Sequence, residues 1–68
     1  MIKYLVIEIQ TQTDDTVGNF VWSYDTQEEA YSKFYSVLSV AAISALPMHS
    51  AVLIGNDGNL IDEKCFWH

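Results

Sequence analysis

The residue types that could carry chemistry in this sequence are few and scattered. Cys65 and His68 form a C-x-x-H pair, and both residue types bind zinc. A zinc site usually takes four ligands, and on a strand this three-residue spacing directs the two side chains to opposite faces. We therefore expect Cys65 to be a structural cysteine near a chain end, and we predict no metal site.

His49 is the other candidate for acid–base chemistry. It opens an expected strand just after Pro47, where it could donate to a ligand at the sheet edge or satisfy turn carbonyls. As a catalytic base it would need a nucleophile and an orienting group, and the sequence has no nucleophile-elbow motif. The nearby carboxylates of Asp57, Asp62 and Glu63 lie on or beside a turn. We predict no catalytic residues and no cofactor, and hence no enzyme.

Aromatic side chains are the most unusual feature of the sequence. They cluster at the end of one expected strand and at the start of the expected helix. Exposed rings can stack on a planar base, and the amides at a helix N-terminus can receive an anion. Packing in the core or at a subunit interface explains the same aromatic residues. The candidate ligand-binding residues are Trp22, Tyr24, Tyr31, Lys33, Tyr35 and His49.

Four strands are expected around one helix. Alternating and β-branched residues predict strands over 2–11, 19–24, 49–54 and 59–67. A polar loop over 11–18 should join the first two strands into a hairpin. Asp57-Gly58 predicts a two-residue type I′ turn between the last two strands.

The helix is expected between the two hairpins. Thr26-Gln27-Glu28-Glu29 matches a capping box, so Thr26 should be the N-cap. Pro47 disfavours continuation, so the helix should end near Leu46. The outer surface carries no charge after Lys33 and is mostly serine, which predicts a subunit contact there. The apolar stripe toward the sheet is Ala30, Phe34, Val37, Leu38, Ala41 and Ala45.

These elements predict a single α+β domain over 1–68, in the order ββαββ, with a four-stranded antiparallel sheet and the helix on one face. A 68-residue chain with one cysteine forms no internal disulfide and is only marginally stable alone. We expect a homo-oligomer that associates through the helix, the free sheet face, or both. That free face is expected to carry several of Tyr4, Val6, Phe20, Trp22 and Tyr24.

Charge excludes some classes of partner. Nine acidic residues against three lysines give a net charge of −6, and there is no arginine. Such a chain repels the phosphates of DNA and RNA, so we predict no nucleic-acid binding. Glu8 interrupts the first apolar stretch, and Pro47 divides the uncharged stretch over 34–56. We therefore expect no membrane association and a cytoplasmic protein.

Five segments resemble small proteins encoded by phages and prophages of gut Firmicutes: Tyr4–Gln10, Ala30–Tyr35, Ala41–Ser44, His49–Leu53 and Asn56–Gly58. The resemblance covers nearly the whole chain, and phage proteins of this size often act as stoichiometric inhibitors. The general character is similar to the oligomeric sponge class, which includes the Sequestin and Lockin families. Those families capture ADP-ribose-type immune signals in pockets between subunits. No binding residue matches theirs position by position.

Two functions follow as hypotheses. The first is a non-enzymatic phage-type inhibitor, a homo-oligomer that sequesters a small nucleotide-derived, ADP-ribose-like immune signal between subunits. The aromatic candidates would stack on the base, while Lys33 and His49 would contact polar groups; the missing arginine counts against a phosphate-rich ligand. The alternative is a protein-binding module that blocks a host protein or serves as a phage structural accessory.

Overall fold

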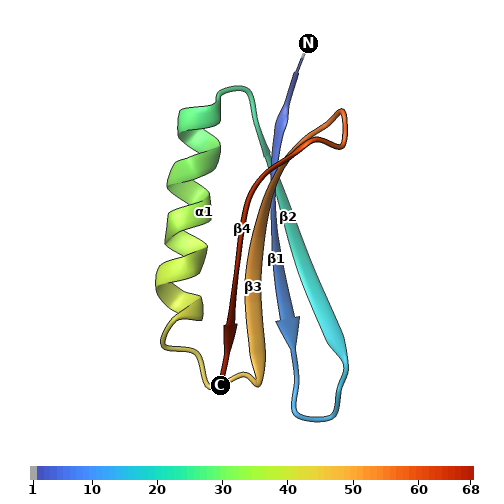
Figure 1. Cartoon of the computed structure of the whole chain (residues 1–68), viewed down its shortest axis with the longest axis vertical. Helices are drawn as coiled ribbons and strands as arrows, with labels where there is room; N and C mark the ends of the chain where they lie inside the picture. Colours follow the sequence, from blue (N-terminus) through green and yellow to red (C-terminus); the bar gives the residue numbers. More distant parts are fainter. Residues whose placement is uncertain (1) are drawn as a thin grey trace.

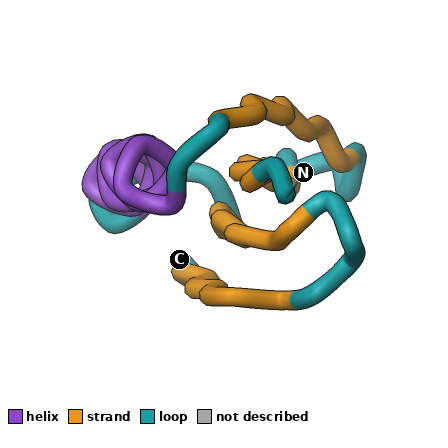
Figure 2. Tube along the Cα trace, turned by 90° about the horizontal axis from the view of Figure 1, so that it is seen from above, coloured by secondary structure: helices purple, strands orange, loops and turns teal. Residues whose placement is uncertain are grey.

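The computed structural model describes residues 2–68 and has the predicted order ββαββ. The elements are β1 (Tyr4–Thr11), β2 (Val17–Tyr24), α1 (Gln27–Ala41), β3 (Met48–Gly55) and β4 (Leu60–Trp67) (Figure 1). The four strands form one antiparallel sheet in the order β2-β1-β3-β4. Figure 2 shows α1 on one side of this sheet and no element on the other.

The N-terminal end of α1 is the capping box that the sequence predicts. The backbone N–H of Glu29 donates to Oγ1 of Thr26 at 3.2 Å, and Thr26 Oγ1 donates to Oε1 of Glu29 at 2.9 Å. Two acidic residues in the first turn also face the positive end of the helix dipole. These contacts fix the point where the chain leaves β2 and turns onto the sheet.

The C-terminal end of α1 comes at Ala41, five residues before the predicted end near Leu46. The N–H groups of Ile43 and Ser44 donate three residues back, to Val40 and Ala41, so the chain tightens and leaves the helix. The Leu46 N–H then donates to Oγ of Ser44 at 3.1 Å, so a local side-chain hydrogen bond replaces the bond that a continuing helix would make.

The prediction of which sheet face the helix covers was wrong. Val6 is fully buried under α1, and Tyr4, Trp22 and Tyr24 pack against the same core. The helix side of β1 carries Glu8 and Gln10 as well as Tyr4 and Val6, so the more apolar side of this strand faces away from the helix and alternation alone could not assign the faces. The face with the larger aromatic side chains lies against the helix. The buried core there is Val6, Ala30, Phe34, Val37, Ala51 and Leu53.

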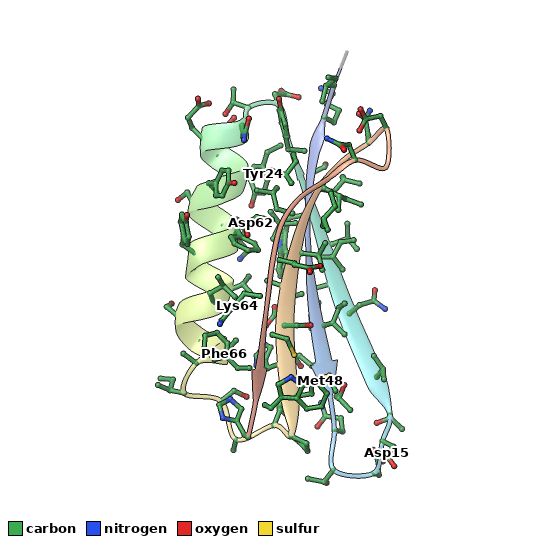
Figure 3. The ribbon with its side chains drawn as sticks, in the orientation of Figure 1. Asp15, Tyr24, Met48, Asp62, Lys64 and Phe66 are labelled. Atoms are coloured by element: carbon green, nitrogen blue, oxygen red, sulfur yellow. The ribbon has the colours of Figure 1, made fainter. Side chains whose placement is uncertain are left out.

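Both hairpins use the same three-residue loop. In the β3–β4 loop, the Gly58 N–H donates to the Gly55 carbonyl and the Gly55 N–H donates to the Asn59 carbonyl, each at 2.9 Å. Gly58 has φ +86°, and Asp57 does not have a positive φ, so the predicted type I′ turn was wrong. The β1–β2 loop repeats this pattern, with Asp15 at φ 69° in the position that Gly58 holds (Asp15 is labelled in Figure 3).

Candidate functional site

The six candidate ligand-binding residues do not lie together. Trp22 and Lys33 meet beside β2, at one edge of the sheet. Tyr31 and Tyr35 stack on each other, and Tyr31 lies near Asp62 of β4, at the opposite edge. His49 is buried, and Tyr24 packs against the core. The structure therefore divides the expected cluster between the two flanks of α1 and the interior.

The flank beside β2 carries a cation–π contact. The Lys33 ammonium lies 4.0 Å from the centroid of the Trp22 ring. The Phe20 ring stacks on the Trp22 ring, with the two centroids 6.1 Å apart. Trp22 and Lys33 are half-buried, and Phe20 is 53% exposed. An exposed aromatic surface with one cation above it can hold a planar group that carries a negative charge.

The flank beside β4 joins two tyrosines to a carboxylate. The Tyr31 and Tyr35 rings stack with centroids 5.6 Å apart, and Tyr31 meets Phe34 of the core edge-on. Burial raises the pKa of Tyr31 above its ordinary value of 10.0, and the negative charge of Asp62 adds to the increase. Asp62 lies on the helix side of β4 (Figure 3), so its charge faces the Tyr31 hydroxyl.

His49 is part of a buried pair and does not line an open site. Its side chain is 3% exposed, and Nε2 lies 2.6 Å from Oε2 of Glu8, whose side chain is 12% exposed. Gln10 donates to the same Glu8 oxygen at 3.1 Å, while Nδ1 of His49 has no hydrogen-bond partner among the described residues. This arrangement links β1 to β3 and leaves the imidazole with almost no exposed surface that a ligand could contact.

Cys65 and His68 point in different directions, as their spacing predicts. Cys65 pairs with Ser50 on the face opposite the helix, whereas His68 Nε2 contacts the carbonyl of Ala41 at 2.9 Å. Within residues 2–68, no group of three His, Cys, Asp or Glu side chains is placed to hold a metal ion.

The largest surface that the sequence did not assign correctly is the sheet face opposite α1, here called the open face. Residues of β1, β2 and β3 that point away from the helix form a mainly aliphatic surface, with polar side chains at Thr11, Asn19, Ser23 and Ser50. Across its centre Ile7 pairs with Val21 on one side and with Val52 on the other. In the paired strands, Glu63 is the only charged residue on this face. The aliphatic residues are Leu5, Ile7, Ile9, Val17, Val21, Val52 and Ile54.

A hollow of about 390 Å³ interrupts the open face above β3 and β4. Ser50 and Cys65 are paired across the two strands, and their short side chains leave the space open. Val52 and Glu63 form the next pair along the hollow. A bulky apolar side chain from a partner could fill this space. The aliphatic part of the open face has no such hollow and can only pack against another apolar surface.

Comparisons of this chain with protein-family models, curated proteins and solved structures found no match. Among residues 2–68, the single helix is too short to cross a membrane.

Proposed function

We propose that this chain is a non-enzymatic binding protein that acts as a homo-oligomer, and that its copies associate through the open face. The observation that carries this proposal is the row Val21–Ile7–Val52 and its aliphatic neighbours, which no described part of the chain covers. A sheet with aliphatic residues on both faces is stable in water when both faces are covered. The pairing of His49 with Glu8 inside the fold also supports a role without catalysis.

Size and charge favour a second copy as the occupant. Four strands of eight residues present roughly 500 Å² in projection, close to the smallest area per partner that a specific interface needs. Two chains of net charge −6 repel each other, yet the open face brings only Glu63 to the contact. Acidic groups elsewhere on the surface then keep the assembled protein soluble.

The test is a charge placed at the centre of the open face. Ile7→Lys should lower the mass of the oligomer in light scattering, because a buried ammonium without a partner disrupts an apolar interface. Thr13→Lys makes the same change of charge in the exposed β1–β2 loop and should leave the mass unchanged. Circular dichroism checks that both variants fold. A folded Ile7→Lys variant with the mass of the wild-type protein would refute the proposal.

A second candidate function is supported by Lys33 above Trp22: capture of a small nucleotide-derived ligand by the oligomer. The indole ring would stack on the base and the ammonium would contact a phosphate. Together with the resemblance to phage proteins, such a site would support the hypothesis of a phage-type inhibitor that sequesters an immune signal. Native mass spectrometry with ADP-ribose should show uptake that Trp22→Ala abolishes and Tyr35→Ala, on the other flank of α1, preserves. Equal uptake by Trp22→Ala would remove this surface from the hypothesis.

A further inference from the structure

The two edges of the sheet are protected to different degrees. The edge strand β4 carries Asp62, Glu63 and Lys64, and its pairing with β3 shifts register between Leu53 and Ile54. Charges and bulges of this kind prevent an edge strand from pairing with another chain. The other edge strand, β2 (Val17–Tyr24), has no charged residue and pairs with β1 over its whole length without a shift. Only the β4 edge is therefore guarded against pairing.

The hydrogen-bonding pattern of the first hairpin shows which backbone groups of β2 are free. The Gln12 N–H donates to the Thr16 carbonyl at 2.9 Å, so these two residues are a hydrogen-bonded pair. Such pairs alternate with non-bonded ones along an antiparallel ladder, so the residues at 18, 20, 22 and 24 bond to β1. The outward N–H and C=O groups belong to Val17, Asn19, Val21 and Ser23, which are all exposed.

We propose that β2 pairs with β2 of a second copy of this chain, antiparallel and about a two-fold axis. The same strand from each chain forms the contact, so no other protein is needed. Because β2 has no charged residue, the contact places no charged strand residue of one chain beside a charged strand residue of the other. Pairing joins two four-stranded sheets into one of eight strands, with the guarded β4 at both ends. The assembly is therefore closed and does not grow into a fibre.

Charges next to β2 distinguish two of the possible registers. Centring the pair on Val21 places Asp25 opposite Val17 of the partner and Phe20 opposite Trp22 of the partner. Moving each chain back by one residue would place Asp25 opposite Asp15, which is a like-charge pair. Of these two registers, the one centred on Val21 avoids the like-charge pair. It extends the Phe20–Trp22 stack of each chain into one aromatic row on the helix side.

This interface is distinct from the open face of the proposed function. A two-fold axis perpendicular to the sheet keeps both helices on one side and both open faces on the other. Two such dimers can then pack face to face, which gives a tetramer when both interfaces form. Each interface can be removed alone, so the two proposals fail separately.

The experiment measures the mass of folded variants by light scattering. Asn19→Pro removes an outward N–H that the fold does not use, and proline is tolerated at such edge positions. Gly18 before it has no Cβ to clash with the ring. We expect the wild-type protein to contain four chains, and Asn19→Pro and Ile7→Lys to contain two each. The double variant should be a monomer, and Asn19→Ala, which keeps the N–H, should match the wild type.

A folded Asn19→Pro variant with the wild-type mass would overturn the edge pairing and leave the open face untouched. A wild-type mass for Ile7→Lys alone would refute the open-face proposal and leave the edge pairing untouched. Should Asn19→Pro fail to fold, amide exchange of the wild-type oligomer decides. The outward N–H groups of Asn19, Val21 and Ser23 should exchange slowly, and exchange as fast as that of loop amides would overturn the pairing.

Discussion

At the scale of single residues, His49 shows how a partner far along the chain decides the role of a side chain. The sequence permitted a ligand donor or a turn cap. The structure instead pairs His49 with Glu8, 41 residues away. The register of β1 and β3 sets His49 opposite Gln10 and Ala51 opposite Glu8, so His49 and Glu8 are diagonal neighbours on the same face. A single sequence carries no signal for that register. The prediction that His49 contacts a ligand has no support in the geometry.

Tyr31 gives a prediction about alkaline pH. Burial and Asp62 raise its pKa, so the folded chain holds this proton more tightly than the unfolded chain does. This stabilising contribution is complete below the ordinary value of 10.0 and is lost as the pH rises through the folded value. We expect an ultraviolet titration to show one tyrosine ionising later than the others, and Tyr31→Phe to remove that component.

Two variants of β4 test the cause of this shift. Asp62→Asn should move the late component toward the ordinary range, because the charge facing Tyr31 is gone. Glu63→Gln removes the same charge from the opposite face and should leave the curve unchanged. Equal curves for the wild-type protein and Asp62→Asn would contradict the assignment.

At the scale of elements, local sequence patterns predicted most of the helix and strand positions. They did not predict the features that depend on tertiary packing. The capping box located the start of α1 to the residue, and β-branched residues, alternation and turn residues together located all four strands. The length of α1 was overestimated because the turn at Ile43 and Ser44 tightens, and the Ser44 side chain bonds the Leu46 N–H, before Pro47 is reached. The open face was misassigned because apolar residues alone do not determine which face of β1 the helix contacts: the helix side carries Glu8 and Gln10 beside Val6.

The two hairpin loops differ in one residue that tests their shared geometry. Asp15 and Gly58 occupy the same left-handed position, which costs a residue with a side chain about 1 kcal/mol. Asp15→Gly should therefore raise the free energy of unfolding by up to about 1 kcal/mol, and Gly58→Ala should lower it by about as much. Urea denaturation measures both. Changes of the same sign would show that the loops do not share this geometry.

At the scale of the whole molecule, the chain combines an acidic surface with two regions of low charge: the open face, with Glu63 alone, and the β2 edge. Composition predicted association, since 68 residues with half of them apolar form a small core. It did not indicate where association occurs, because that requires knowing which apolar residues the helix covers. The same limit applies to the aromatic residues, which the sequence placed in one cluster and the fold separates across two flanks of α1.

The mass of the wild-type protein in solution, measured by light scattering over a range of concentrations, tests the account most directly. We predict a discrete multiple of the 7.7 kDa chain that persists on dilution and contains four copies when both interfaces form. A mass of one chain at every concentration would contradict it, because the open face would then remain uncovered in the folded protein.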